Sequence, residues 1–371
     1  MSYEPRNVLI TGGAGFIGAN FVRHWLEQSR EGRVIVLDAL TYAGNAASLE
    51  ELTNNPRYGF VRADICDERA VRELIETQRI DTLVHFAAES HVDRSILGPD
   101  DFIRTNIVGT HVLLKITKEL WLEKRLVPAH RFHHVSTDEV YGSLAPDDAP
   151  FHEATPYAPN SPYSASKAAS DHLVRAYHET YGLQTTVTNC SNNYGPYQFP
   201  EKLIPLALIN ILKGKPVPVY GDGLQVRDWL HVKDHCAAIE LALRRGMPGA
   251  VYNIGGASEV QNIQLVHLLC SLVDTHLEQH PGMRSVYPDS PLFAGGRATQ
   301  LIQHVRDRPG HDRRYAIDFR KARTELGYSP HQDLPAGLRA TLEWYVAHAD
   351  WWQALLGRNY DAWIARNYTR T

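Results

Sequence analysis

Short apolar segments alternate with longer helical patterns through the first half of this 371-residue chain. Runs rich in β-branched and aromatic residues predict strands at 7–11, 33–37, 58–63, 82–87, 131–136 and 184–190. Helical periodicity between several of them predicts helices at 16–28, 68–77, 101–122 and 162–181. The alternation indicates an α/β fold, a doubly wound parallel sheet with helices on both faces. The nearly unbroken apolar strands fit a sheet that is buried on both sides.

The pattern changes at about residue 191, where "NNYGPYQFPEK" begins a loop rich in Pro, Gly and Asn. Later segments such as "YGDGLQVRDWLHVKD" and "YNIGG" carry Arg, His and Tyr on shorter elements. We therefore expect one domain over 1–190, joined by about 226–250, and a smaller, discontinuous lobe over most of 191–371. Clustered Gly, Pro and Ser predict an extended surface loop at 284–305.

Composition narrows the class of protein. A net charge of −4 gives no nucleic-acid signature and no polybasic membrane signature. The N-terminal segment predicts no signal peptide, and the longest apolar run, 203–212, is too short to span a bilayer. The four cysteines form no CxxC pair and the 19 histidines are scattered, so we expect no disulfide framework and no metal site. A reducing, cytoplasmic location fits these cysteines.

A glycine-rich segment, "VLITGGAGFIGANF", joins the first strand to the first helix. Its Gly12, Gly15 and Gly18 can give a tight turn, a close approach to a pyrophosphate and tight helix packing. The helix N-terminus supplies N–H groups and a positive dipole for phosphates. Asp38 ends the next strand, about 20 residues later, where a carboxylate can accept from ribose hydroxyls. The pattern predicts a Rossmann-type site that favours NAD over NADP.

Asp64 follows the third strand and has two interpretations. It can lie beside the adenine, or it can cap the helix that follows. The sequence does not separate the two.

Tyr163 and Lys167 in "PYSASKAASDHL" are four residues apart, so a helix places them on one face. A nearby ammonium and a positively charged nicotinamide favour the phenolate form of a tyrosine. Tyr163 could then take a proton from a sugar hydroxyl, while Lys167 holds the nicotinamide ribose. Alone, this spacing is common surface patterning. After a dinucleotide-binding segment and just after "VSTDEVYG", it indicates a catalytic pair.

In these motifs the chain resembles the extended short-chain dehydrogenase/reductase family over nearly its whole length. The similarity is carried by "TGGAGFIG", "FAAESHVDRS", "TNIVGT", "VSTDEVYG", "PYSASKAASDHLV" and "NNYGPYQFPEKLIP". Within that family, "RDWLHVKDHCAAI" and "RPGHDRRYAID" are most similar to the dTDP-glucose 4,6-dehydratases. The resemblance implies an NAD site formed by Gly12, Gly15, Phe16, Ile17, Gly18, Asp38, Asp64, Ile65, Ala87, Ala88, Thr105, Tyr163, Lys167 and Asn193.

The resemblance also explains two adjacent acids, Asp138 and Glu139, which could otherwise be solvated loop residues. A dehydratase oxidises carbon 4 of the sugar, expels water across carbons 5 and 6, and returns hydride to carbon 6. Glu139 is implied as the base at carbon 5, Asp138 as the acid for the 6-hydroxyl, and Thr137 as a hydrogen-bond partner of the carbon 4 oxygen. For that role the pKa of Asp138 must rise above about 3.9, which burial beside a carboxylate would cause.

The smaller lobe is implied to bind dTDP-glucose. Arg227 and Arg308 suit phosphate geometry, although each could instead form a surface ion pair. Asn262 could simply cap the helix that follows it. The implied substrate site consists of Ser90, Thr137, Asn192, Lys202, Leu203, Pro218, Tyr220, Arg227, Asn262, Asp307, Arg308 and His311. The segment before "RDRPGH" is longer than the family pattern, which leaves the nucleotide preference open.

Other interpretations are a nucleotide-sugar epimerase, a UDP-glucuronate decarboxylase, a 4,6-dehydratase of another nucleotide sugar, or an NAD-binding regulatory protein. The "TDE" run at 137–139 disfavours the first two, and the complete catalytic set disfavours the last. The resemblance implies a homodimer that pairs the helices at 101–122 and 162–181 across a two-fold axis. It also implies deoxysugar biosynthesis, with rhamnose supply and secondary metabolism both open.

Overall fold

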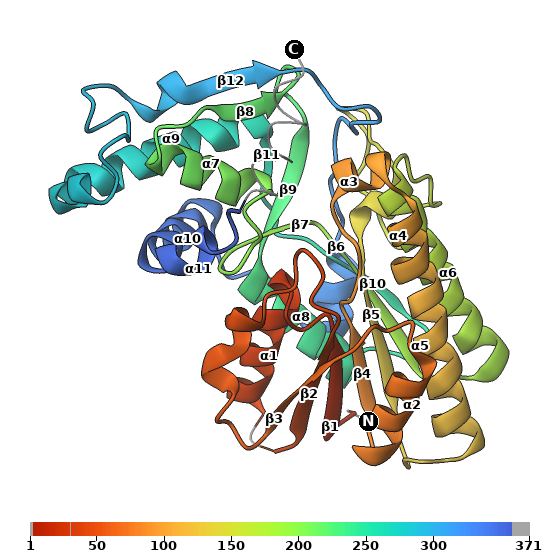
Figure 1. The fold of residues 1–371 in the computed structure, drawn as a ribbon. Helices are drawn as coiled ribbons and strands as arrows, with labels where there is room; N and C mark the ends of the chain where they lie inside the picture. The colour runs from red at the N-terminus through yellow and green to blue at the C-terminus, as the bar shows by residue number, and fades with distance from the viewer. Residues whose placement is uncertain (1–2, 30, 358–371) are drawn as a thin grey trace.

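The computed structural model describes residues 3–29 and 31–357. A seven-stranded sheet has the order β10-β6-β5-β4-β1-β2-β3, and all of its pairs are parallel (Figure 1). Its strands are β1 (Asn7–Thr11), β2 (Arg33–Asp38), β3 (Tyr58–Arg62), β4 (Thr82–His85), β5 (Arg131–Thr137), β6 (Thr185–Cys190) and β10 (Val251–Ile254). The strand order reverses between β1 and β4, where an open sheet of this type forms its ligand crevice. The predicted α/β, doubly wound fold is confirmed.

Helices cover both faces of this sheet. One face carries α1 (Phe16–Gln28) and α8 (Val232–Arg245), and the other carries α2 (Glu68–Thr77), α5 (Thr110–Thr117) and α6 (Pro162–Tyr181) (Figure 1). Alternate strand residues enter different cores: Val8 and Ile10 pack in the α1–α8 layer, whereas Leu9 packs in the α2–α5–α6 layer. Burial on both sides explains the unbroken apolar strands.

The predicted helix bounds agree for α1, α2 and α6, but the segment predicted as a helix at 101–122 is irregular. It runs as α4 (Asp100–Phe102), a π-helical turn η2 (Ile103–Gly109), α5 and a second π-helical turn η3 (Lys118–Glu123). The Asn106 carbonyl, inside η2, accepts from the Thr110 and Ser170 hydroxyls. Such side-chain competition for a helical carbonyl is typical of local departures from α geometry.

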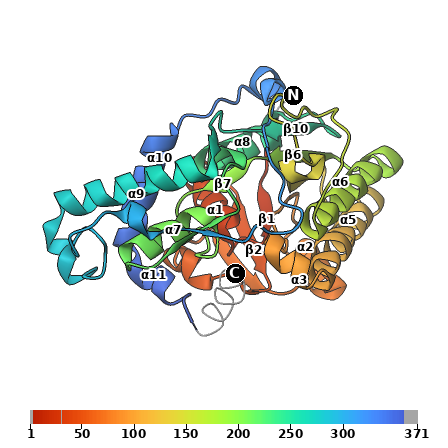
Figure 2. The same ribbon diagram turned by 90° about the horizontal axis from the view of Figure 1, so that it is seen from above.

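A second group of helices and strands lies beside the large sheet (Figures 1 and 2) and encloses an apolar core of its own. It is formed largely by α7 (Leu203–Leu212), β8 (Val217–Tyr220), α9 (Asn262–Gln279), α10 (Leu334–Ala347) and α11 (Ala349–Gln353), with β12 (Ile302–Val305) parallel to β8. A three-stranded sheet has β9 (Val226–His231) between β7 (Asn192–Tyr194) and β11 (Glu259–Gln261). Residues 1–2 of the expected first domain and 358–371 of the expected lobe lie outside the described residues.

The remaining elements are short. They are α3 (Val92–Leu97), the 3₁₀ turns η1 (Ala46–Leu52), η4 (Asp138–Tyr141), η5 (Pro281–Ser285) and η6 (Ala298–Leu301), and the π-helical turn η7 (Ala322–Leu326). In the described part of the chain, no helix combines the length and apolar character needed to cross a bilayer.

Two sequence-based expectations were wrong. The "YNIGG" segment does not belong to the smaller lobe, because Val251–Ile254 forms β10 and pairs with β6 at the edge of the large sheet. The segment 284–305 is not simply a surface loop, since it contributes η6 and β12 and buries Tyr287 and Ala298. The Gly- and Pro-rich turns of this segment obscured its short ordered elements in the sequence. The Asp274 carboxylate fixes one of them by accepting a hydrogen bond from the Ala298 N–H.

The contact between α10 and β7 gives a test of the packing. A Cβ built at Gly337 would overlap the hydroxyl of the buried Tyr194, next to Asn192 and Asn193. We expect Gly337→Ala to lower the free energy of unfolding by about 1–3 kcal/mol, despite the better helix propensity of alanine. Urea unfolding of the purified variants measures this.

Adding Tyr194→Phe, which removes the overlapping oxygen, should restore most of the loss. Gly282→Ala is the control, since a Cβ there has open space around it. Wild-type stability of Gly337→Ala would contradict this packing.

Candidate active site

Two cavities open at the carboxyl ends of the parallel strands. The first, of about 310 Å³, extends from the glycine-rich turn after β1 to the end of β5. The second, of about 170 Å³, lies between α3 and the smaller lobe. Residues common to both walls include Ser90, Glu139, Asn192, Asn193 and Lys202. The two cavities therefore adjoin, with Glu139 at their boundary.

The first cavity brings together the whole set of residues predicted for the cofactor. Its wall includes Gly12, Gly15, Phe16, Ile17, Gly18, Asp38, Asp64, Ile65, Ala87, Ala88, Thr105, Tyr163, Lys167 and Asn193. Thr137, Asp138 and Glu139 line the same cavity at its other end. Residues from the loops after β1 and β4 and from β5, α6 and β7 thus meet at one sheet edge.

The glycines fit a bound dinucleotide. Gly12 has φ of +70°, and a Cβ there would meet the backbone of Ala87, while a Cβ at Gly18 would overlap the Gly12 carbonyl. The nearest atom to a Cβ at Gly15 is Gly12 O, at 3.3 Å, so Gly15 leaves its open side to the cavity. Gly15 is the N-cap of α1 and, within the described chain, makes no side-chain cap, so the first-turn N–H groups can receive an anion.

Asp38 is fixed beside this turn. Its Oδ2 accepts from Ala14 N at 2.9 Å and its Oδ1 accepts from Leu40 N at 2.8 Å. Burial raises the pKa of this carboxyl, and the two backbone N–H groups oppose that rise. A carboxylate held in this way can accept ribose hydroxyls and repels a ribose phosphate.

The alternative role of Asp64 as a helix cap is wrong. The α2 N-cap is Asp67, whose side chain accepts from Arg69 N and Ala70 N. Asp64 instead accepts from Cys66 N at 2.8 Å and pairs with Arg104 at 3.2 Å, while lining the first cavity.

The adjacent acids sit in a turn at the end of β5. Thr137 is the N-cap of η4, and its Oγ1 accepts from Glu139 N at 3.3 Å. Asp138 is only 1% exposed, and its Oδ2 has no hydrogen-bond partner within the described chain. The turn breaks the alternation of a strand, so both acids face the same cavity. The interpretation as solvated loop acids is therefore wrong.

The two acids differ electrostatically. Burial raises the pKa of Asp138 well above its ordinary value, and the Glu139 carboxylate adds to the rise. Burial also raises the pKa of Glu139, but Arg308, Lys202 and Arg227 oppose that rise. Cations thus favour the ionised form of Glu139, whereas Asp138 is pushed toward its neutral acid. This difference suits a base and an acid side by side.

Tyr163 and Lys167 lie on the face of α6 that lines the first cavity. Burial and Glu139 raise the pKa of Tyr163, while its hydrogen bond with Thr137 lowers it. Lys167 Nζ donates to Val135 O at 2.9 Å. The protein alone therefore keeps Tyr163 neutral, and formation of a phenolate requires a further positive charge in the cavity.

The second cavity brings together most residues predicted for the substrate: Ser90, Asn192, Lys202, Leu203, Pro218, Tyr220, Arg227, Asn262, Arg308 and His311. Asp307 instead contacts the Nδ1 of His311 at 2.6 Å and, in the described structure, lines neither cavity.

Arg227 is not the surface ion pair that its alternative interpretation required. It is buried, it donates to the carbonyls of Val226 and Asp312, and it lies over the Tyr315 ring. Arg308 donates to Asp93 Oδ1 at 3.3 Å. Three cations, including Lys202, thus surround a small cavity, as an anionic ligand would require.

Several buried polar atoms around this cavity lack a partner in the described structure. Among them are Asn192 Oδ1, Asn262 Oδ1, Trp229 Nε1 and Arg308 Nε. Asn262 does not cap α9, since the N-cap is Gln261. Buried polar groups are normally hydrogen-bonded, so these atoms indicate a polar ligand.

Sequence reasoning missed Asp93 and Glu201. Asp93 joins the two parts of the site, because its carboxylate accepts from Arg308 and from Tyr220 OH at 3.0 Å. Glu201, on the wall of both cavities, pairs with Arg94 at 2.9 Å. Asp93 lies in the motif "HVDRS" and Glu201 in "FPEK". In each motif a basic residue follows the acid, and this pairing of charges could have indicated a site residue.

Comparisons with known proteins agree with this geometry. The family model for GDP-mannose 4,6 dehydratase matches residues 9–341. A dTDP-glucose 4,6-dehydratase of Neisseria meningitidis is 51% identical over 357 residues, covering 96% of this chain and 97% of that protein.

Two solved structures of dTDP-glucose 4,6-dehydratases are also similar. DesIV from Streptomyces venezuelae, with NAD bound, has a TM-score of 0.83 at 44% identity, covering 94% of this chain and 99% of that one. The Bacillus anthracis enzyme in complex with NAD has a TM-score of 0.81 at 42% identity, with the same coverage. Motifs, fold and site agree, and the chain belongs to the dTDP-glucose 4,6-dehydratases of the extended short-chain dehydrogenase/reductase family.

Proposed function

We propose that this chain converts dTDP-glucose into dTDP-4-keto-6-deoxyglucose and water, with NAD as a resident cofactor. The observation that carries the proposal is the adjacent pair Asp138 and Glu139. Both acids line the glycine-rich cavity, Glu139 also lines the cation-lined cavity, and Asp138 is buried. Epimerisation and simple oxidation have no need for two such acids. The 51% identical relative has the same activity in its name.

Gly12, Gly15, Gly18 and Asp38 would hold NAD at its pyrophosphate and adenosine ribose. Lys167 would hold the nicotinamide ribose. When bound, NAD supplies a hydride acceptor at carbon 4, a hydride donor at carbon 6 and a positive charge near Tyr163. Oxidation and reduction then balance within one turnover.

Each catalytic residue has a defined proton in this scheme. Tyr163 takes the proton of the 4-hydroxyl, and Thr137 donates to the oxygen on carbon 4. Glu139 removes the proton on carbon 5, which the new ketone has acidified. Asp138 protonates the departing 6-hydroxyl. The supporting observation is the charge balance, since Glu139 faces three cations and Asp138 is fully enclosed.

The second cavity would bind the nucleoside diphosphate. Arg227 and Arg308 present guanidinium groups, which match phosphate oxygens in geometry and charge. Unpaired amide oxygens of Asn192 and Asn262 can accept from sugar or base N–H and O–H groups. Asp307 would act by orienting His311.

We also propose a cytoplasmic homodimer that serves deoxysugar synthesis. All four cysteines are free thiols, as in a reducing compartment. Exposed apolar groups lie along the adjacent segment 100–123 and α6, with Ile103, Val108 and Tyr181 each about half exposed. A second copy that applies the same face would bury them.

The proposed reaction is tested by product analysis. Purified protein with dTDP-glucose should give a 4-keto-6-deoxy sugar nucleotide, with no stoichiometric accumulation of NADH because hydride returns to carbon 6. UDP-, GDP- and CDP-hexoses in parallel reactions measure nucleotide preference. A C4 epimer as the product, or consumption of NAD in proportion to sugar, would contradict the proposal.

Separate roles for the two acids predict different defects. Glu139→Gln should still oxidise carbon 4 but should lose exchange of the carbon 5 hydrogen with deuterated solvent. Asp138→Asn should keep that exchange while elimination of water slows. Loss of a general acid or base commonly costs about 10²–10⁴-fold in rate. Single-turnover absorbance of the reduced cofactor, with mass spectrometry of the sugar, separates the steps.

Tyr163→Phe is the control for these variants, because it should block the first oxidation. Equal loss of exchange in both acid variants would show that the acids titrate as one coupled pair and that their roles are not separate.

The homodimer predicts a sedimentation mass of twice the 41.8 kDa chain. Val108→Glu should shift the protein toward the monomer, because it places a carboxylate in the apolar face. Met247→Glu, at an exposed position on another part of the surface, is the control. A monomeric wild-type protein at micromolar concentration would contradict the proposed dimer.

A further inference from the structure

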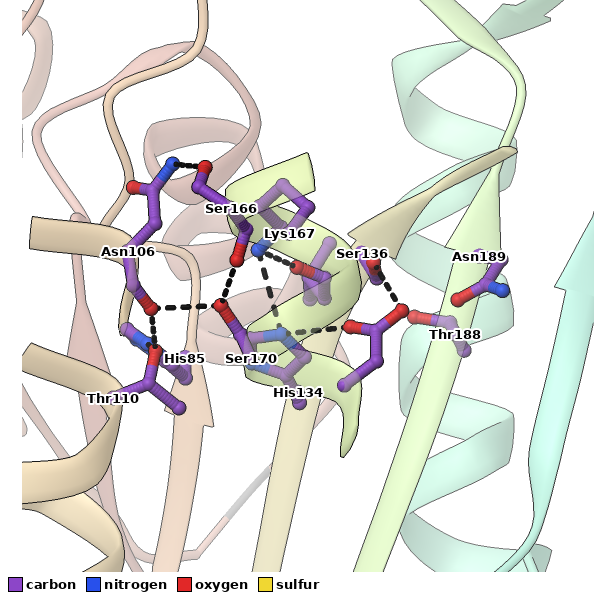
Figure 3. Close-up of polar contacts among 12 residues, drawn as sticks. His85, Asn106, Thr110, His134, Ser136, Ser166, Lys167, Ser170, Thr188 and Asn189 are labelled. Atoms are coloured by element: carbon purple, nitrogen blue, oxygen red, sulfur yellow. Dashed lines mark hydrogen bonds and ion pairs between the residues drawn. The ribbon is translucent and has the colours of Figure 1, made fainter. Parts of the chain in front are cut away.

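A buried polar cluster lies beneath the ammonium of Lys167 (Figure 3). Besides its bond to Val135 O, Lys167 Nζ lies 3.4 Å from His134 Nε2. The same ring nitrogen lies 3.2 Å from Asp171 Oδ1. Lys167 is 4% exposed, Asp171 is 5% exposed and His134 is fully buried. A cation and an anion therefore lie on either side of one imidazole nitrogen in the buried interior.

Asp171 is held rigidly in this position. Its Oδ2 accepts from Ser136 Oγ at 2.8 Å and from Tyr157 OH at 3.0 Å. Its Oδ1 has no other hydrogen-bond partner in the described chain and faces His134. Asp171 and Lys167 are four residues apart on α6, so the helix itself places both on one face.

The same helix is fixed on its other side. Asn106 Nδ2 donates to Ser166 Oγ at 2.8 Å, and Ser170 Oγ donates to the Asn106 carbonyl at 2.7 Å (Figure 3). Thr110 donates to that carbonyl as well. These bonds tie α6 to the segment 100–123, so the Lys167 backbone has little freedom to move.

His134 is a neutral link in this cluster. Burial lowers the pKa of its ring well below the ordinary value, and Lys167 adds to the effect. Its Nε2 can accept from Lys167 or donate to Asp171, but a single nitrogen cannot do both. The tautomer of His134 therefore decides whether its Nε2 bonds to the lysine or to the carboxylate.

The charge of Lys167 depends on its surroundings. Burial lowers its pKa to about 8, and Asp171 is the strongest opposing group, followed by Cys190 on β6. The other titratable groups that face this region are Tyr163 on α6, His134 on β5 and His85 on β4. Burial raises the pKa of Asp171 to about 6. Between about pH 6 and 8 the lysine and the aspartate are both charged.

We propose that Asp171 and His134 are positioning residues for Lys167. The Asp171 carboxylate keeps the buried ammonium charged, and the His134 ring, together with Val135 O, directs its remaining N–H groups to the cofactor cavity. The inference rests on the proposed function in taking Lys167 as the residue that holds the nicotinamide ribose. It adds two residues that lie one layer below the cofactor-binding wall.

Asp171→Asn is the decisive variant because it removes the charge without changing the shape. Ser136 and Tyr157 can still donate to the amide oxygen, and the new NH₂ can donate to His134 Nε2, so the fold should persist. Asp171→Glu keeps the carboxylate and should retain most of the wild-type behaviour. Asp147→Asn, the same substitution at an exposed position, is the control.

The direct measurement is the pKa of Lys167 in the cofactor-free protein, by NMR of ¹³Cε-labelled lysine. The signal that disappears in Lys167→Met gives the assignment. An opposite charge at this range typically shifts a pKa by about 1–3 units, so Asp171→Asn should lower that of Lys167 by at least one unit. An unchanged Lys167 pKa in Asp171→Asn would overturn the inference, whatever the activity of the enzyme.

A lower pKa of Lys167 should also change the pH dependence of the enzyme. Lys167 is active as an ammonium, so the alkaline limb of single-turnover cofactor reduction should move to lower pH in Asp171→Asn, by the shift measured by NMR. Asp147→Asn should leave it in place. A shifted lysine with an unchanged pH profile would refute the role of Lys167 in the proposed function, while the charge relation to Asp171 would stand.

His134 is tested separately. His134→Gln keeps a neutral acceptor beside Nζ and should preserve NAD affinity, measured by equilibrium dialysis, whereas His134→Leu should weaken it about tenfold, equivalent to 1.4 kcal/mol. Both should shift the Lys167 pKa less than Asp171→Asn does. Equal NAD affinity in the wild type and His134→Leu would remove His134 from the proposal.

Discussion

Parallel strand alignment is the constraint on which the site depends. Because β1, β4, β5 and β6 run in the same direction, their carboxyl ends meet at one sheet edge. One region of the molecule therefore collects the glycine-rich turn, the acidic turn η4 and the start of β7. These segments are far apart in the sequence, since 180 positions separate Gly12 from Asn192. No long-range attraction between these segments is needed, since the sheet core already fixes them.

Exclusion of water determines the protonation states of the groups at the carboxyl edge of the sheet. Every ionisable group near Glu139 loses solvation, so each charge must be stabilised by another group of the protein. The cations Lys202, Arg227 and Arg308 come mainly from the smaller lobe, whereas the acids come from the large sheet. The two parts of the chain therefore stabilise each other electrostatically, in addition to their packing. Asp93 shows the same relation, as an acid from α3 that accepts from Arg308 and Tyr220.

Local sequence determined much of this arrangement. Strands, helices α1, α2 and α6, and the cavity-lining glycines follow from periodicity and spacing, because each depends on neighbours within a few residues. The irregular turn η2 was not predicted, since one of the two hydroxyls that donate to its Asn106 carbonyl belongs to Ser170 on another helix. β10 was missed because a run of only four residues becomes a strand only when a sheet edge is available. The contact between Asp171 and His134 could not be predicted, because it joins residues on two different elements, α6 and β5.

The shared wall of the two cavities limits how far this enzyme can be treated as an assembly of modules. Asn192, Asn193 and Lys202 lie where the chain passes from the large sheet into the smaller lobe, and each lines both cavities. A chimaera joined at residue 191, made to exchange one nucleotide preference for another, would replace part of the cofactor-lining surface as well. Transferable specificity must therefore come from positions that line the second cavity alone, such as Pro218, Tyr220 and Asn262.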